Sequence, residues 1–134
     1  RGLPLTIYGT GEQTRAFSYI DDCLEPLWKA ATLDKTSKQI INLGGTREYS
    51  INQAADVLIE VMGGGEKVHL EQRHEALHAW STWKKSVDLL DYKDTISLKD
   101  GLTQMWEWAK TQPDRGQFKW SKYEIEKGIY SYWK

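Results

Sequence analysis

Glycine clusters divide this sequence into short segments. The clusters are Gly9-x-Gly11, Gly44-Gly45 and Gly63-Gly64-Gly65. Glycine adopts backbone conformations that end strands and helices, so each cluster marks the end of one element. No Lys-Ser/Thr pair follows the triple glycine, which favours a helix stop there over a phosphate-binding loop. The chain is therefore expected to fold from short elements.

Hydrophobic patterns predict both strands and helices between these clusters. The expected strands are residues 5–8, 16–20, 39–43 and 67–70. The expected helix caps are Asp21 or Asp22, Ser50, Ser81 or Thr82, and Ser97. Ser50 and Gln53 form a capping box, and Ser97 opens the clearest helix, which residues 113–116 end. The pattern predicts an α/β (mixed α+β) fold with three to four helices.

Composition limits the classes of function. The chain has 134 residues, with 18 basic and 19 acidic side chains, which fits one domain and argues against a dedicated nucleic-acid binder. Cys23 is its only cysteine, so we expect no internal disulfide. We find no membrane span and no signal-peptide pattern, and we expect a cytoplasmic protein. The chain starts without methionine, so we expect a trimmed start or a piece of a longer protein.

The last residues differ from the rest of the chain. Residues 117–134 are aromatic and charged, and they have no clear period. We therefore place a boundary after residue 116, with an extended tail beyond it. Tyr123 and Lys127 match the Tyr-x-x-x-Lys pair of short-chain dehydrogenases, but that pair belongs on a helix against a nucleotide-binding sheet. We expect a structural tail.

One stretch matches a zinc-protease motif. His74, Glu75 and His78 form H-E-x-x-H. A zinc protease needs both histidines one turn apart on a helix, and a third ligand further along. Here the residues before His74 have the pattern of a strand that runs into a loop. Ser81 and Lys84 stand where one protease class has its glycine and its third histidine, so we expect no metal site.

Two arginines lie beside the expected strands. Arg15 and Arg73 each flank a transition from strand to loop. A guanidinium group matches phosphate oxygens, so two arginines at one site are a common solution for binding a diphosphate. Composition alone favours the alternative that both are ordinary surface residues.

The order of the segments resembles that of a known family. The C-terminal halves of extended short-chain dehydrogenases that act on nucleotide sugars are similar to PLTIYGTGEQTRAFSYIDDCLEPLWKA, INLGGTREYSINQAADVLIEVMG, LEQRHEALHAWSTWKKSVDLLDY and SLKDGLTQMWEWAK, in this order. FKWSKYEIEKGIYSYWK is similar to a tail in some of these enzymes. UDP-glucose 4-epimerase and its relatives are the nearest description. The resemblance makes H-E-x-x-H incidental.

The resemblance assigns substrate-binding roles to individual positions. Tyr8, with the backbone of Thr6, matches the strand that packs against the nucleotide base. Arg15 and Arg73 match the arginines that face the diphosphate. Glu75 lies near the acidic residue that accepts hydrogen bonds from the ribose, although the residues between Arg73 and Glu75 depart from the family's Arg-Pro-Gly-Asp/Glu. The resemblance assigns no catalytic, cofactor-binding or metal-binding residue to this chain.

The resemblance also implies a function. The full-length enzymes use NAD for epimerisation or dehydration of a UDP- or dTDP-sugar, and their glycine-rich NAD loop and catalytic Tyr-Lys helix have no counterpart in this chain. We therefore expect no complete Rossmann domain and no activity of the chain alone. The alternatives are a noncatalytic module that binds a partner or a glycan and, more remotely, a zinc hydrolase.

The resemblance finally suggests how copies of the chain could associate. The helix that carries Leu24, Leu27 and Trp28, and the strand at residues 40–43, are expected to face the family's nucleotide-binding domain. Large exposed apolar surfaces are rare on soluble monomers. We therefore expect self-association through this surface, unless the tail covers it.

Overall fold

The computed structural model describes residues 2–114 and 116, which form short helices and strands. The helices within these residues are α1 (Ile20–Thr32), α2 (Ile51–Met62), α3 (Lys84–Leu90) and α4 (Leu98–Lys110), with a 3-10 turn, η1 (Asp34–Thr36), after α1. The strands are β1 (Leu5–Tyr8), β2 (Thr14–Ala16), β3 (Glu48–Ser50), β4 (Lys67–Leu70) and β5 (His78–Ala79). The expected α/β class is confirmed.

Some sequence-based expectations concern residues that the structure does not describe. The tail at 117–134, the boundary before it and the Tyr123-x-x-x-Lys127 pair lie outside the described residues. Among the helices of the described part, none combines the length and hydrophobicity that a bilayer crossing requires.

The strands form two small sheets. β1 and β4 pair in parallel, with Leu5 opposite Lys67 and Tyr8 opposite Leu70. In the second sheet β2 is central, antiparallel to β3 and parallel to β5. Arg15, the middle residue of β2, therefore lies between β3 and β5.

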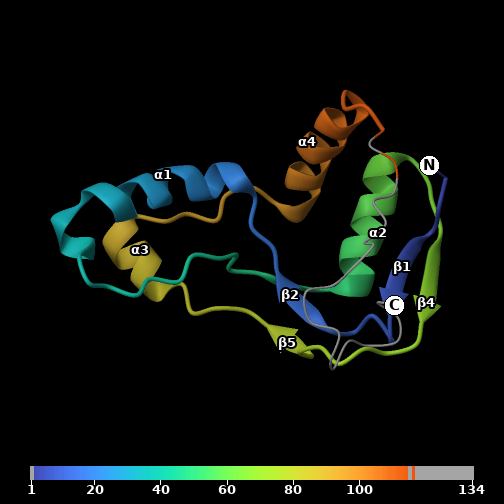
Figure 1. The fold of residues 1–134 in the computed structure, drawn as a ribbon, viewed down its shortest axis with the longest axis horizontal. Helices are drawn as coiled ribbons and strands as arrows, with labels where there is room; N and C mark the ends of the chain where they lie inside the picture. The colour runs from blue at the N-terminus through green and yellow to red at the C-terminus, as the bar shows by residue number, and fades with distance from the viewer. Residues whose placement is uncertain (1, 115, 117–134) are drawn as a thin grey trace.

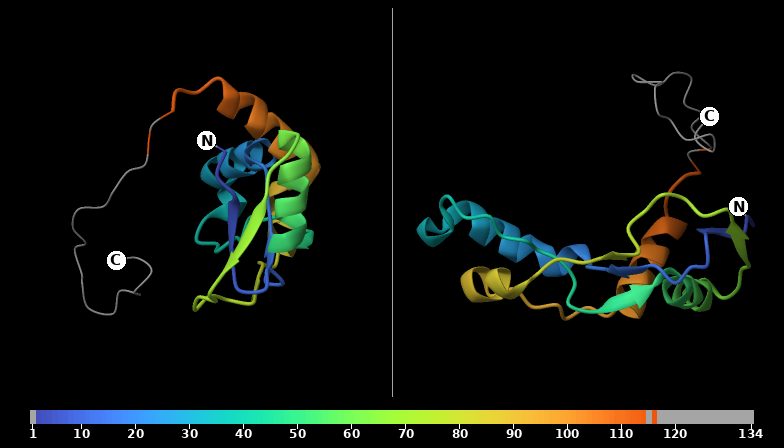
Figure 2. Two further views of the ribbon diagram at one scale, coloured as in Figure 1. Left: turned by 90° about the vertical axis from the view of Figure 1, so that its right-hand side faces the viewer. Right: turned by 90° about the horizontal axis from the view of Figure 1, so that it is seen from below.

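The elements gather at two ends of a long molecule. Figure 1 shows α1 and α3 at one end, and α2, α4, β1 and β4 at the other, with β2 and β5 between them. The view from below in Figure 2 separates the same two groups along the long axis. At one end α2 packs on α4 and β1, and at the other end α1 contacts α3.

Each end has its own small buried group. Ile7 of β1 is 2% exposed, and Ala55 of α2 is also buried. Leu90, the last residue of α3, and the nearby Tyr92 are buried as well. Many large apolar side chains elsewhere are exposed, so the described residues bury little of their apolar surface.

The two helices with a serine cap, α2 and α4, begin as expected. The hydroxyl of Ser50 accepts a hydrogen bond from the backbone N–H of Gln53, and the Gln53 side chain accepts one from the N–H of Ser50. Ser97 caps α4 by accepting from the N–H of Asp100. Gly63 ends α2 in the left-handed conformation, at φ 79°. These local signals satisfy the free groups of the helix ends.

The expected cap of α1 is wrong. The helix begins at Ile20 after Tyr19, and neither Asp21 nor Asp22 caps it. The Asp22 carboxylate instead accepts hydrogen bonds from residues 95 and 96. A long-range contact thus takes the carboxylate that the sequence suggested for the local cap.

The strand expected at residues 16–20 is displaced. β2 covers Thr14–Ala16, because its pairing with β5 ends at Arg15 and its pairing with β3 ends at Ala16. Residues 17–19 are irregular, and residue 20 already belongs to α1.

The strand expected at residues 39–43 does not form. These residues are irregular, and the side chain of Ile40 is 87% exposed. A strand needs a neighbour for its backbone hydrogen bonds, and no strand of the described residues pairs with this segment. The hydrophobic pattern alone does not supply that neighbour.

The expected start of α3 is also wrong. The helix begins at Lys84 after Trp83, beyond both Ser81 and Thr82. β5 pairs with β2 as far as Ala79, and the next residues lead the chain from that sheet to α3 (Figure 1). The extended connection passes through both candidate caps.

Candidate functional site

A tight turn at residues 9–13 is the base of the candidate site. It packs on the N-terminus of α2, where the backbone N–H groups of Ile51 and Asn52 donate to the carbonyls of Gln13 and Gly11, both at 3.0 Å. Gly11 has φ 77°, and a Cβ atom there would lie 2.3 Å from Oδ1 of Asn52. The turn therefore requires glycine at position 11 and holds the residues after it in a fixed place.

Gln13 connects this turn to two other segments. Its side-chain amide donates to the backbone carbonyl of Tyr8 at 2.9 Å and to Oε1 of Glu75 at 3.0 Å. Gln13 is only 8% exposed. The end of β1 and the loop after β4 are thus tied together at one side chain.

Arg15 forms an ion pair with Glu75. Nη2 of Arg15 lies 3.2 Å from Oε2 of Glu75, and each side chain is 25% exposed. Nη1 of Arg15 also donates to the carbonyl of Thr14 at 2.7 Å. Such a partly exposed guanidinium group is held in place yet accessible to a ligand.

Arg73 lies over the ring of Tyr8. Its guanidinium carbon is 3.6 Å from the ring centroid, which is the geometry of a cation–π contact. Both residues are half-buried. One face of the Tyr8 ring therefore carries the arginine.

Together these contacts bring most of the sequence-predicted residues into one network, which we call the arginine cluster: Tyr8, Gln13, Arg15, Arg73 and Glu75. Thr6 lies two residues before Tyr8 on β1. It is exposed, and its backbone position is opposite Val68 of β4. The cluster combines two cations with one carboxylate, so its formal charge is positive.

Sequence reasoning missed Gln13. A signal was available, because Gln13 and Arg15 are two residues apart and alternate residues of an extended segment point the same way. Its importance depends on contacts with Tyr8 and Glu75, which are distant in sequence.

The histidines of the H-E-x-x-H stretch do not share a helix. His74 lies in a bend, and His78 begins β5. Nδ1 of His78 is 2.8 Å from the hydroxyl of Thr14, which donates to Glu48. Within residues 2–114 and 116, no three His, Cys, Asp or Glu side chains are grouped as metal ligands.

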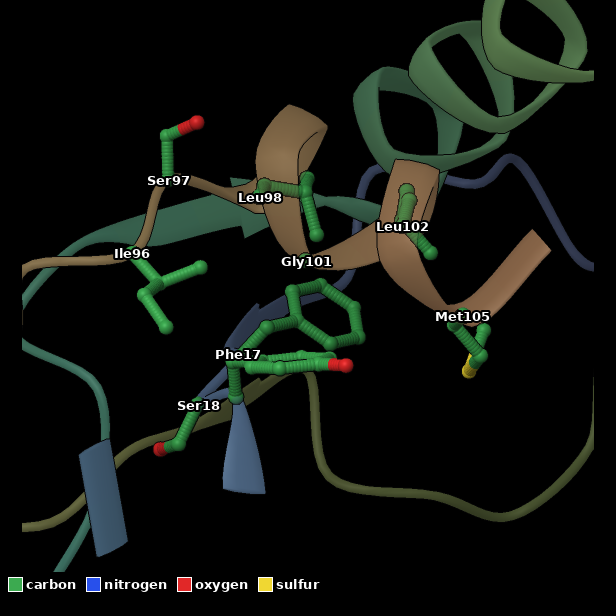
Figure 3. A pocket seen from close by; sticks show the side chains of 9 residues that line it. Phe17, Ser18, Ile96, Ser97, Leu98, Gly101, Leu102 and Met105 are labelled. Carbon is green, nitrogen blue, oxygen red and sulfur yellow. The ribbon is translucent and has the colours of Figure 1, made fainter. Parts of the chain in front are cut away.

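A second feature is an apolar hollow of about 250 Å³ between α4 and residues 17–19. Figure 3 shows Phe17 beside α4, near Leu98, Leu102 and Met105. No residue of the arginine cluster lines this hollow. Its apolar lining suits hydrophobic contact and not recognition of a phosphate.

Comparison with known proteins identifies relatives of the chain. No family model matches it. It is 34% identical over 110 residues to the UDP-glucuronate 4-epimerase of Thermodesulfobacterium geofontis, covering 80% of this chain and 33% of the relative. It is 31% identical to UDP-glucuronic acid decarboxylase 1 of Xenopus tropicalis, covering 78% of this chain and 25% of the relative.

A solved structure shares the fold. The UDP-glucuronic acid 4-epimerase of Bacillus cereus, in complex with UDP-glucuronic acid and NAD, matches with a TM-score of 0.73 and 36% identity, over 80% of this chain and 35% of the epimerase. The chain is homologous to one part of the enzymes of the NAD-dependent nucleotide-sugar epimerase and dehydratase family. It spans about a third or less of the length of these relatives.

The glycine turn of this epimerase-related chain does not fit a dinucleotide. NAD-binding loops present glycine-rich backbone and a free helix N-terminus to the pyrophosphate. Here the N–H groups of Ile51 and Asn52 already donate to the turn, and the Asn52 side chain fills the space beside Gly11. No step of an epimerase reaction is therefore assigned to this turn.

Proposed function

We propose that this chain is the nucleotide-sugar-binding portion of an NAD-dependent epimerase or dehydratase. The observation that carries the proposal is the arginine cluster, in which Arg15 and Arg73 are linked through Glu75, Gln13 and Tyr8. Two guanidinium groups held by neighbours and partly accessible suit the oxygens of a diphosphate.

Four members of the cluster have a proposed role in binding the nucleotide. Arg15 and Arg73 bind the diphosphate, and the Tyr8 ring packs against the base together with the backbone of Thr6. Glu75 accepts hydrogen bonds from the ribose hydroxyls. A carboxylate has about four lone-pair sites, so Glu75 can accept from the ribose while it keeps its hydrogen bonds from Arg15 and Gln13.

We propose that the chain alone is inactive. By resemblance, the family's NAD loop and catalytic Tyr-Lys helix belong to a part of the enzyme that this chain does not match. NAD would take and return a hydride in the complete enzyme, and the residues here would only hold the nucleotide. The pure chain, supplied with NAD and UDP-glucose, is expected to form no UDP-galactose, and detectable conversion would contradict this.

Calorimetric titration tests the binding role. UDP-glucuronic acid, UDP-glucose and dTDP-glucose are titrated into the chain, into Arg73→Ala and into Arg47→Ala, which removes an exposed arginine outside the cluster. We expect nucleotide binding by the unaltered chain and about tenfold or greater weakening by Arg73→Ala, since charge-assisted hydrogen bonds contribute roughly 1.5–3 kcal/mol. Equal effects of the two variants, or no binding at all, would refute the proposal.

The comparisons do not support the glycan-binding or zinc-hydrolase alternatives, since the relatives above are named as nucleotide-sugar enzymes. A parallel titration with a glycan would detect the first alternative, because a glycan-binding module would respond to the glycan and not to the nucleotide sugars.

We also propose that α1 mediates self-association. The polar side of α1 faces the chain, since Asp22 binds residues 95 and 96 and Lys29 lies 3.9 Å from Asp91. The apolar stripe faces solvent, with Leu24 55%, Leu27 54% and Trp28 70% exposed. An amphipathic helix normally buries its apolar stripe, so a second copy is the proposed cover.

A further inference from the structure

Gln13 is the least exposed polar side chain of the arginine cluster, at 8%, whereas the side chains of Arg15 and Glu75 are 25% exposed. A buried amide group is costly unless its hydrogen-bonding groups have partners. The family resemblance gives Gln13 no role, so its burial within a polar site has to be explained by its contacts.

Both hydrogens of its amide group have acceptors. One is donated to the carbonyl of Tyr8 and the other to Oε1 of Glu75. An NH₂ group has two donors, so these contacts use its full donor capacity. The backbone carbonyl of Gln13 accepts from Ile51 of α2, which fixes the other end of the residue.

The two residues that accept hydrogen bonds from Gln13 also contact the two arginines, although Tyr8 accepts through its backbone carbonyl and contacts Arg73 through its ring. Tyr8 carries the guanidinium group of Arg73 on its ring, and Glu75 holds that of Arg15. Gln13 therefore contacts one residue of each pair.

We propose that Gln13 is a positioning residue, which sets the arrangement of Arg15 relative to Arg73 through its hydrogen bonds to Glu75 and Tyr8. The inference rests on the proposed function, because the purpose of the arrangement is to match a diphosphate. A site of this kind needs supporting residues that lock the orientation of the groups that touch the ligand. Glutamate has the same length but cannot donate both bonds, and asparagine is one methylene shorter.

The test compares UDP with uridine, which lacks the diphosphate. Affinities for both are measured for the unaltered chain, for Gln13→Met, which keeps the length but has no donor, and for Gln104→Met, an exposed matched control on α4. We expect Gln13→Met to reduce the UDP-to-uridine affinity ratio about tenfold, because the diphosphate contacts are lost selectively. Gln104→Met should leave the ratio unchanged.

A merely structural role predicts a different result. Loss of stability would lower both affinities by the same factor and leave the ratio as it is, which would overturn the proposal. The double substitution Gln13→Met with Glu75→Ala adds a second criterion. If Gln13 acts through Glu75, the two effects on the ratio are not additive, whereas full additivity contradicts the proposal.

A measurement without nucleotide separates this inference from the proposed function. Solvent exchange of the Arg15 guanidinium N–H groups is followed by NMR in the chain, in Gln13→Met and in Gln104→Met. Severalfold faster exchange in Gln13→Met alone supports the positioning role, and unchanged exchange overturns it. If the unaltered chain binds no UDP, the proposed function fails, and the exchange rates still decide the role of Gln13.

Discussion

Glu75 engages both oxygens of its carboxylate within the chain, one with Gln13 and one with Arg15. This ion pair is partly exposed, so its contribution to stability is expected to be small. Its larger effect is on orientation, because the carboxylate keeps the guanidinium group of Arg15 near the loop that carries Arg73. A diphosphate would then share Arg15 with Glu75.

Asp22 gives a stability prediction at the residue scale. Burial alone raises the pKa of Asp22, but hydrogen bonds from Thr95 and Ile96 outweigh it and leave the pKa below its ordinary value. The charged form therefore stabilises the fold at pH values above the unfolded pKa of about 3.9, and this stabilisation is lost as the pH falls through the lower folded value. We expect Asp22→Asn to lower the free energy of unfolding by about 1–2 kcal/mol at neutral pH.

Chemical denaturation at neutral and acidic pH checks this prediction. The difference between the chain and Asp22→Asn should shrink in acid. Asp21→Asn is the control, because Asp21 is the exposed neighbour in the same helical turn. Equal losses from both substitutions would indicate a general effect of charge near the helix N-terminus instead.

At the scale of elements, the sequence predicted the helix starts that depend on local contacts. Ser50 and Ser97 cap their helices through residues three positions away, so those starts could be found from spacing. Residues 39–43 have a strand pattern but no neighbouring strand, and Asp22 is taken by residues 95 and 96. Such outcomes depend on residues distant in the chain.

The candidate site could likewise be predicted only in part. The family resemblance pointed to Tyr8, Arg15, Arg73 and Glu75, which the fold brings into one network. Neither a motif nor spacing indicated that Glu75 would pair with Arg15. The hydrogen bonds of Gln13 to Tyr8 and Glu75 join segments that are distant in the sequence, so its spacing from Arg15 alone does not predict them.

The turn at residues 9–13 supports a prediction with a matched control. Gly11 and Gly63 have similar positive φ angles, 77° and 79°, so alanine strains the backbone at both by about 1–2 kcal/mol. A Cβ atom at Gly11 meets Asn52, whereas one at Gly63 meets no atom within 4 Å. We expect Gly11→Ala to lower the free energy of unfolding clearly more than Gly63→Ala, as measured by denaturant titration. Equal losses would mean that Asn52 moves aside without cost.

At the scale of the whole molecule, the exposed stripe of α1 predicts assembly. Light scattering over a wide range of concentrations should show a rise in mass with concentration, because burial of large apolar side chains contributes roughly 1.5–3 kcal/mol each. Leu27→Glu should abolish the rise, since it places a charge in the centre of the stripe.

Trp108→Glu is the control for this experiment, because Trp108 is 60% exposed but lies on α4. A monomer mass at every concentration, with cooperative unfolding, would contradict self-association and mean that a single copy of the chain forms a complete core. Loss of assembly in the control alone would place the contact on α4.

The central claim is that the arginine cluster binds the nucleotide part of a sugar nucleotide. The most direct measurement is a titration of the isotope-labelled chain with UDP-glucuronic acid, followed by NMR. The account predicts saturable shifts concentrated in residues 6–15 and 73–75, including the guanidinium signals of Arg15 and Arg73. Saturable shifts confined to the apolar hollow beside α4, or an unchanged spectrum at high ligand concentration, would contradict it.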